Sequence, residues 1–331
     1  MNCEIKSIKN KRILISPLNW GLGHVTRTVP VIQQLIDQSN QVFVACDSNQ
    51  KSLYIDHFPD LDYIHLAPYP FKFGGKGQWG VDLLKSHLNL RKFMLYEKQF
   101  VKEASHELAI DLIISDQRYG FCHPEKTSIF ISHQLKLAIP WYFSLAQWMN
   151  KYYINRFNHI WVPDKKGSVL SGKLSRGFEH KKSFIGYCSQ LFEQSKNEKH
   201  EKKYDYLGIV SGPSPYAEKL YELLLDKLED LDKQSAIVVP ESIYNSTKIK
   251  PNITVHVQPS PTKLNSLFDL SSTVIARNGY TTLLDLEMKG NSAILIPTPK
   301  QHEQIYLSYY HTNHPKWMFV NENNFYKMTL D

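Results

Sequence analysis

Residues 12–47 read RILISPLNWGLGHVTRTVPVIQQLIDQSNQVFVACD. The apolar run Arg12–Pro17 ends in a glycine-containing turn, and apolar residues then recur at helical spacing from Val25 to about Asp37. A second apolar run, Gln41–Asp47, follows closely. Short apolar strands joined by amphipathic helices are typical of a parallel sheet that helices cover on both faces. This stretch therefore predicts a β-α-β unit.

The same alternation continues along the whole chain. In the first half we expect a long helix over 81–108 and further strands at 62–67, 111–116, 128–132 and 159–162. In the second half we expect helices at 216–231, 261–270, 280–289 and 301–310, and no final helix that returns to the first domain. The strands expected there are 204–211, 235–239, 253–257, 273–276 and 293–296. The pattern predicts an α/β protein with two Rossmann-like domains and a cleft between them.

The chain has 331 residues, enough for two domains of ordinary size. The charged segment 190–203 (QLFEQSKNEKHEKK) has no sustained apolar period, which is typical of a linker. We therefore expect an N-terminal domain over 1–189, a linker over 190–203 and a C-terminal domain over 204–331.

Composition narrows the functional classes. The apolar fraction is 42% and the charged fraction 21%, as in ordinary globular proteins. A formal net charge of +7 favours anionic partners, but no nucleic-acid-binding module accompanies it, so we expect no nucleic acid partner. The four cysteines are far apart and fit reduced thiols in a cytoplasmic protein. No signal peptide or membrane-spanning run is apparent.

The turn Gly21-Leu22-Gly23-His24 follows the first strand and precedes a helix. Glycines there let a ligand approach the backbone amides at the helix N-terminus, although a purely structural turn is the alternative. His24 would face the carboxyl ends of the strands, where open sheets bind ligands. An imidazole at that place can act as a general base near neutral pH.

Two further strands end in polar side chains. Asp116 and Arg118 follow the strand 111–116, and His133 follows the strand 128–132. Asp116 is a second candidate for the base, or it could orient His24. We expect Arg118 and His133 to line the same site. The alternatives are an Asp–Arg pair that secures a loop and a structural histidine.

A second strand–turn–helix junction reads ARNGYTTLLD. Its strand ends at Arg277, and Asn278-Gly279 makes the turn. The amides of Tyr280 and Thr281 then lie at a helix N-terminus beside a cation, an arrangement suited to a phosphate group. Asp285, about one turn further, could accept hydrogen bonds from a ribose. An ordinary helix start with a solvated acid is the alternative.

This junction resembles the donor-binding signature of family 28 glycosyltransferases, the MurG-like transferases that use UDP-N-acetylglucosamine. Their pattern is a small residue and a glycine, an acid about six residues on, an apolar strand ending in proline, and a glutamine-rich stretch. The chain matches it with Asn278, Gly279, Asp285, Ile294–Pro297, Gln301 and Gln304. The resemblance implies that Asp285 binds the ribose and that Gln304 binds the sugar hydroxyls.

Two other segments are similar to the same family. The turn ending at His24 resembles its N-terminal Gly-Gly-x-Gly-Gly-His loop, and Ser211-Gly212 falls where the family has a loop that contacts the diphosphate. The resemblance implies a GT-B fold, in which the N-terminal domain is the acceptor side and the C-terminal domain binds the nucleotide sugar; we then place Arg118 and His133 on the acceptor side. It also implies inverting transfer from a UDP-sugar to a hydroxyl, with no metal and no further cofactor. Asp60-Leu61-Asp62 and Asp230-Leu231-Asp232 match the D-x-D pattern of metal-dependent transferases, but neither follows a strand end.

Aromatic residues gather in the glycine-rich segment 68–80 and in 139–161 (IPWYFSLAQWMNKYYINRFNHIW). They point to a lipid-linked or cell-envelope glycan as acceptor. We expect 139–161 to pack against the sheet, and the alternative is peripheral contact with an anionic membrane at its inner face.

Two other functions fit the same motifs. A nucleotide-sugar epimerase would share the fold and the donor site, and His302, Glu303 and His133 could supply its additional acid and base groups. A protein that binds nucleotide sugars without catalysis is the other alternative.

Overall fold

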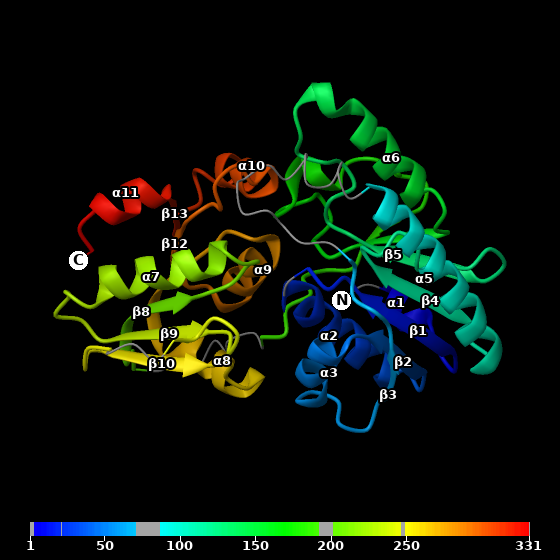
Figure 1. Ribbon diagram of the computed structural model, residues 1–331, viewed down its shortest axis with the longest axis horizontal. Helices are drawn as coiled ribbons and strands as arrows, with labels where there is room; N and C mark the ends of the chain where they lie inside the picture. Colours follow the sequence, from blue (N-terminus) through cyan, green and yellow to red (C-terminus); the bar gives the residue numbers. More distant parts are fainter. Residues whose placement is uncertain (1–2, 21, 71–86, 192–200, 246–248, 331) are drawn as a thin grey trace. The chain divides into compact units, whose positions relative to one another are not determined.

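The computed structural model describes residues 3–20, 22–70, 87–191, 201–245 and 249–330. The chain divides between Gln190 and Leu191 into two compact units, and each is an α/β layer structure (Figure 1). Most of the glycine-rich segment 68–80 lies outside the described residues, and so does Gly21. Among the helices that are described, none is long and apolar enough to span a bilayer.

The N-terminal unit has a seven-stranded parallel sheet in the order β3-β2-β1-β4-β5-β6-β7. Its strands are β1 Arg12–Pro17, β2 Gln41–Cys46, β3 Asp62–His65, β4 Leu112–Asp116, β5 Thr127–Ile131, β6 His159–Val162 and β7 Lys182–Phe184. Its helices are α1 Cys3–Ser7, α2 Leu22–Asp37, α3 Ser48–Ile55, α5 His87–Glu107 and α6 Ser144–Ile154, with short 3-10 turns at Trp141–Phe143 and Gly172–Ser175.

Strand β1 shows why this sheet is covered on both faces. Ile13 and Ile15 belong to one buried cluster together with Ile32 of α2, whereas Leu14 belongs to a second cluster together with Val101 of α5. Successive side chains of a strand point to opposite faces, so α2 and α5 cover opposite sides of the sheet. This explains the unbroken apolar pattern of the strand.

The C-terminal unit has a six-stranded parallel sheet in the order β10-β9-β8-β11-β12-β13. Its strands are β8 Tyr204–Ile209, β9 Ser235–Val239, β10 Ile253–Val257, β11 Ser271–Ala276, β12 Ser292–Leu295 and β13 Trp317–Phe319. Its helices are α7 Tyr216–Leu228, α8 Pro261–Asp269, α9 Tyr280–Lys289, α10 His302–Tyr310 and α11 Glu322–Lys327.

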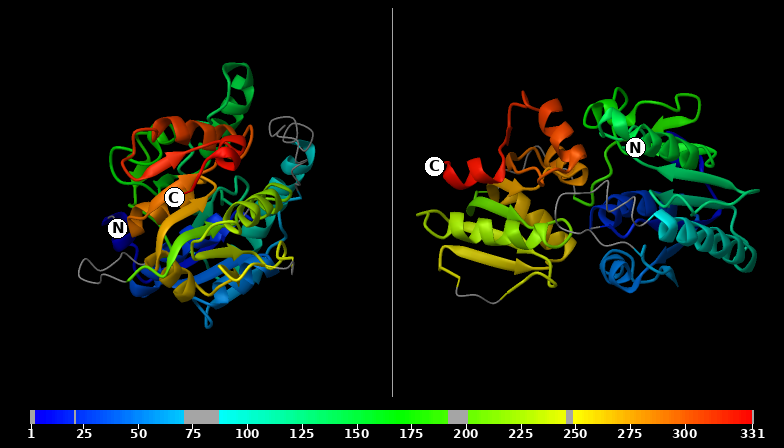
Figure 2. Two further views of the ribbon diagram at one scale, coloured as in Figure 1. Left: turned by 90° about the vertical axis from the view of Figure 1, so that its left-hand side faces the viewer. Right: turned by 45° about the horizontal axis from the view of Figure 1, so that its top comes forward.

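Both sheets reverse their strand order beside the first strand of the unit, the arrangement of Rossmann-type sheets. The prediction of two Rossmann-like units is therefore confirmed. Beyond the last predicted helix, the structure adds β13 and α11. Phe325 of α11 is fully buried in the same cluster as Leu224 of α7, and the two helices lie side by side (Figures 1 and 2).

Candidate functional site

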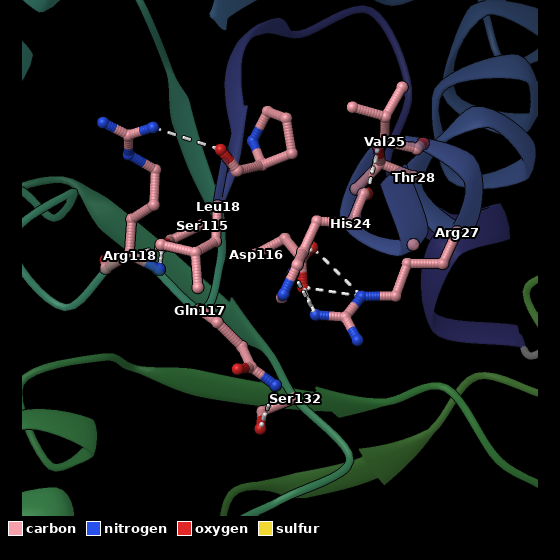
Figure 3. Close-up of polar contacts among 12 residues, drawn as sticks. Leu18, His24, Val25, Arg27, Thr28, Ser115, Asp116, Gln117, Arg118 and Ser132 are labelled. Atoms are coloured by element: carbon pink, nitrogen blue, oxygen red, sulfur yellow. Dashed lines mark hydrogen bonds and ion pairs between the residues drawn. The ribbon is translucent and has the colours of Figure 1, made fainter. Parts of the chain in front are cut away.

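Three neighbouring strands of the N-terminal sheet deliver polar side chains to one edge (Figure 3). Pro17 of β1 pairs with Asp116 of β4, and Asp116 pairs with Ile131 of β5, so the carboxyl ends of the three strands are aligned. His24 lies in the first turn of α2, which begins at Leu22, earlier than predicted. His133 follows β5.

His24 and Asp116 form a hydrogen-bonded pair. His24 Nδ1 lies 2.8 Å from Asp116 Oδ2, and the side chain of His24 is 14% exposed while that of Asp116 is fully buried. When Nδ1 carries the proton and donates it to the carboxylate, Nε2 keeps its lone pair and can accept a proton. The geometry thus allows Asp116 to orient His24.

Arg27 is part of this cluster and was not predicted. Its Nε donates to both carboxylate oxygens of Asp116, at 2.9 and 3.0 Å, and its Nη1 lies 3.3 Å from His133 Nδ1. The side chain is buried. A signal was present in the sequence, because Arg27 is three residues after His24 and such residues share one face of a helix.

Burial and charge set the protonation of the pair. Burial lowers the pKa of His24 below its usual value and the Arg27 guanidinium lowers it further, while the Asp116 carboxylate opposes both. Burial alone would raise the pKa of Asp116, but the charges of Arg27 and His24 hold it below its usual value. Near neutral pH the cluster therefore contains an ionised carboxylate and a neutral imidazole.

Asp116 and Arg27 compete for the same atom of His24. Arg27 Nη2 contacts Asp116 Oδ1 and also lies 2.6 Å from His24 Nδ1. Nδ1 can donate its proton to the carboxylate, or it can accept one from the guanidinium, but it cannot do both. The first arrangement leaves Nε2 as a base, and the second places the proton on Nε2. Arg27 therefore influences which ring nitrogen of His24 carries the proton.

Arg118 occupies a different place from the one predicted. It points away from the cluster, is fully buried, and its Nε donates to Glu97 Oε1 at 2.6 Å (Figure 3). Its guanidinium also donates to the carbonyls of Pro17 and Ala67, at 3.2 and 3.1 Å. In this conformation Arg118 cannot line an acceptor site, and it holds the loop after β4 instead.

The loop after β4 is fixed closely against α5. The amide of Gly120 donates to Glu97 Oε2 at 3.2 Å, and a Cβ atom at this glycine would lie 2.5 Å from the carbonyl oxygen of Met94. No side chain fits there without displacing backbone. Burial raises the pKa of Glu97, and the Arg118 guanidinium counteracts that rise. The loop therefore gives Asp116 a rigid support.

In the C-terminal unit, Arg277 is also buried. Its Nη2 lies 2.6 Å from Glu322 Oε1, and its guanidinium donates to the carbonyls of Ile296 and Tyr216 at 3.4 and 3.3 Å. These bonds tie the end of β11 to the neighbouring loops and to α11. Arg277 is 2% exposed and its two Nη atoms are engaged by these partners, so we assign it to support of the fold and not to contact with a diphosphate.

Three predicted donor residues help to build the start of α10. Asn278 is buried, and its Nδ2 donates to the Gln304 carbonyl at 2.6 Å and to Ser308 Oγ at 3.0 Å. Gln301 caps the helix by accepting the Gln304 amide at 2.5 Å, and Gln304 Oε1 accepts the Thr298 amide at 2.7 Å. These bonds fix α10 next to the junction between β11 and α9.

The start of α9 leaves space beside Gly279. Its φ of −62° is open to any residue, and a Cβ atom there would meet nothing closer than Thr282 Oγ1 at 3.9 Å among the described residues. Tyr280 is buried, whereas Thr281 and Asp285 are partly exposed and one turn apart on α9. Neither the backbone nor its neighbours require a glycine here, which fits the close approach of a ligand.

The remaining predicted glycines differ in their surroundings. Gly212, after β8 and beside the partly exposed Ser211, has a φ of +107°, which disfavours any residue with a side chain. Gly23 lies within α2, where its carbonyl accepts a hydrogen bond from Thr26 Oγ1 at 3.3 Å.

A pocket of about 390 Å³ lies in the N-terminal unit next to the first turn of α2. Val25 of that turn is part of the pocket lining, and the polar lining residues include Asn19, Asp47, Asn49 and His65. These residues follow or end β1, β2 and β3, so the pocket lies at the same edge of the sheet as His24.

Over the described ranges, no group of three or more His, Cys, Asp or Glu side chains is arranged to hold a metal ion. Three cysteines in those ranges are free and buried. Burial raises the pKa of Cys46 and of Cys188 to about 12, so these thiols stay protonated and are poor nucleophiles.

The fold is similar to that of solved glycosyltransferases. The spinosyn rhamnosyltransferase SpnG, complexed with thymidine diphosphate, is 12% identical with a TM-score of 0.66, covering 95% of this chain and 90% of its own. MurG of Acinetobacter baumannii is 14% identical with a TM-score of 0.55, and the match covers 96% of this chain and 86% of MurG. The glycosyltransferase SnogD of Streptomyces nogalater is 14% identical with a TM-score of 0.60, and the match covers 95% of this chain and 88% of SnogD. These likenesses show a GT-B fold. No protein-family model and no curated protein matches the sequence.

Proposed function

We propose that the chain is an inverting glycosyltransferase. It would move a sugar, N-acetylglucosamine or a related hexose, from a UDP-sugar to a hydroxyl group of a lipid-linked or cell-envelope glycan. The observation that carries the proposal is the hydrogen bond between the partly exposed His24 and the buried Asp116, at the carboxyl ends of the strands, where open parallel sheets bind their ligands.

In this mechanism the acceptor oxygen attacks the anomeric carbon while His24 Nε2 takes the proton of its hydroxyl group. The bond from the anomeric carbon to the diphosphate breaks as the new bond forms, and the diphosphate leaves with the electron pair. Asp116 keeps His24 in the required tautomer and stabilises the imidazolium ion that results.

The donor is assigned to the C-terminal unit. The backbone amides at the start of α9 would bind the diphosphate, where Gly279 leaves room for close approach. Asp285 would accept bonds from the ribose, and the amide group of Gln304 would donate to the sugar. SpnG was solved with thymidine diphosphate, which supports a nucleoside diphosphate as the ligand class.

The pocket beside Val25 is our candidate for the acceptor. Its carboxylate, amide and imidazole groups suit hydroxyl-bearing ligands, and it adjoins the turn that carries His24. SpnG has also been solved with its spinosyn aglycone, so an acceptor is known to bind a protein of this fold.

The test is calorimetric titration of the full chain with UDP, thymidine diphosphate and UDP-N-acetylglucosamine. We expect a nucleotide to bind, and Asp285→Ala to weaken that binding. Glu222→Ala, which removes an exposed acid from α7, is the matched control and should bind normally. Failure of the wild-type chain to bind any of these ligands would overturn the donor assignment.

The epimerase alternative is tested by incubation with UDP-N-acetylglucosamine alone. A transferase needs an acceptor and should leave the sugar configuration unchanged. Formation of the epimer without any acceptor would replace the transferase proposal by the epimerase one.

A further inference from the structure

Helix α6 buries Ile154 near its end, but over its first two turns amide side chains face the unit and large apolar side chains face solvent. Gln147 and Asn150 face the unit, where Gln147 Oε1 accepts the Leu137 amide at 2.7 Å and Asn150 Oδ1 accepts the Tyr119 hydroxyl at 2.6 Å. Leu145 and Trp148 are exposed, with 61% of Trp148 accessible to solvent. A surface helix normally buries its apolar residues and exposes its amides, so this helix needs an explanation outside its own unit.

The exposed apolar residues form one stripe. Tyr142, in the 3-10 turn before α6, is followed at helical spacing by Leu145, Trp148 and Tyr152, and all four are more than half exposed. The rings of Trp148 and Tyr152 stack with their centroids 5.7 Å apart. We call these four residues the aromatic stripe. The interpretation that this segment packs inward is therefore wrong for its outer face.

The surroundings of the stripe are positively charged. Arg156 lies over the Tyr152 ring at 4.9 Å, and Arg91 and Lys98 of α5 are close enough to help lower the pKa of Tyr152, although Arg156 has the largest effect. Lys151 is exposed on α6. No Asp or Glu occurs between residues 134 and 163. The charged groups that act on Tyr152 are thus all basic, and the segment 134–163 contributes no acidic residue to the surroundings of the stripe.

We propose that the aromatic stripe and the flanking basic residues form a docking surface for an anionic lipid membrane. Indole and phenol groups combine an apolar ring with a polar atom, so they favour the headgroup region of a bilayer. Lys and Arg beside them add attraction to anionic lipids. Helix α6 stays attached to its unit through Gln147 and Asn150 while its outer face meets the lipid.

The test is co-sedimentation of the full chain with vesicles of phosphatidylcholine alone and of phosphatidylcholine mixed equally with phosphatidylglycerol. We expect binding to the anionic vesicles and little binding to the neutral ones. Trp148→Ser combined with Tyr152→Ser should weaken binding at least about tenfold, because both rings leave the interface. The matched control is Tyr309→Ser with Tyr326→Ser, which removes two rings of the C-terminal unit that are at least as exposed.

Charge is tested separately. Arg91→Gln and Lys151→Gln should each weaken binding to anionic vesicles about fivefold, whereas Lys219→Gln and Lys233→Gln on the C-terminal unit should have much smaller effects. The substituted side chains are exposed, so the melting temperature should remain unchanged and serves as the folding control.

Any one of three results would overturn the proposal. The first is no binding to anionic vesicles, and the second is an equal loss of vesicle binding in the stripe variant and its control. The third is a stripe-dependent dimer in sedimentation velocity without vesicle binding. The last result would assign the surface to a second copy of the chain. None of these measurements needs a sugar donor, so they succeed or fail independently of the proposed transfer reaction.

Discussion

Replacing Asp116 by asparagine separates the shape of the His24–Asp116 pair from its charge. Asparagine is nearly isosteric, so the cluster should keep its packing. The buried carboxylate that accepts from His24 Nδ1 at 2.8 Å becomes a neutral amide, and the imidazolium formed during transfer loses its counter-ion. An amide can also present its NH₂ group to Nδ1, which favours the tautomer that cannot act as a base.

The expected size of the effect follows from the geometry. With the two charge centres about 4 Å apart and an effective dielectric constant of about 20, the interaction amounts to about 4 kcal/mol. One factor of ten in rate corresponds to about 1.4 kcal/mol, so kcat should fall about 10³-fold if the full charge develops in the transition state. Arg27 also loses its buried counter-charge, which should lower the free energy of unfolding by about 3 kcal/mol.

The assay is steady-state transfer from the donor that calorimetry identifies, with urea denaturation run in parallel. Donor affinity is the control, because the proposed donor residues are in the C-terminal unit and should bind normally. His24→Ala sets the rate without any base. If Asp116→Asn keeps kcat within about tenfold of the wild type while His24→Ala does not, the orienting role of Asp116 is refuted.

Three further predictions use other parts of the structure. Arg27→Met should raise the pKa of His24, because the Arg27 guanidinium lowers that pKa. The fall of kcat on the acid side of its pH profile should then occur at higher pH, and a fall at the same or a lower pH would contradict this. Glu97→Gln should lower the free energy of unfolding by about 3–5 kcal/mol in urea denaturation, because Arg118 stays buried without its counter-ion. A decrease below about 1 kcal/mol would contradict a structural role for this ion pair. Gly279→Ala should change the free energy of unfolding by less than about 1 kcal/mol, because the site has room for a methyl group. It should weaken nucleotide binding about tenfold or more in calorimetry, and normal binding would show that the diphosphate does not lie beside Gly279.

Much of the fold could be predicted from the sequence because its strands are buried on both faces. The predicted bounds of β6, β9 and β10 agree with the structure, since each is a short apolar run between turns. The short strands β7 and β13 were not predicted. Each has only three residues, too few for a periodic signal.

The charged residues of the site were harder to place. Arg118 and Arg277 follow strands, so they were expected to face ligands, but their ion-pair partners lie 21 and 45 positions away in the chain. Arg27 is a single cation in an amphipathic helix, a pattern usually found on a solvated face, and its partner Asp116 is 89 positions away. Sequence spacing shows which residues share an element, whereas these pairings depend on which elements are neighbours in space.

The neighbouring positions of β1 and β4 also bear on how the protein is made. His24 and Asp116 are 92 positions apart and meet only because these two strands pair across a crossover that contains β2, β3 and α5. During synthesis, a chain that has emerged as far as α5 holds the histidine without its carboxylate. Contacts this distant in sequence form late and slow the folding of a domain. The proposed base would therefore be assembled only when the central strands of the sheet have paired.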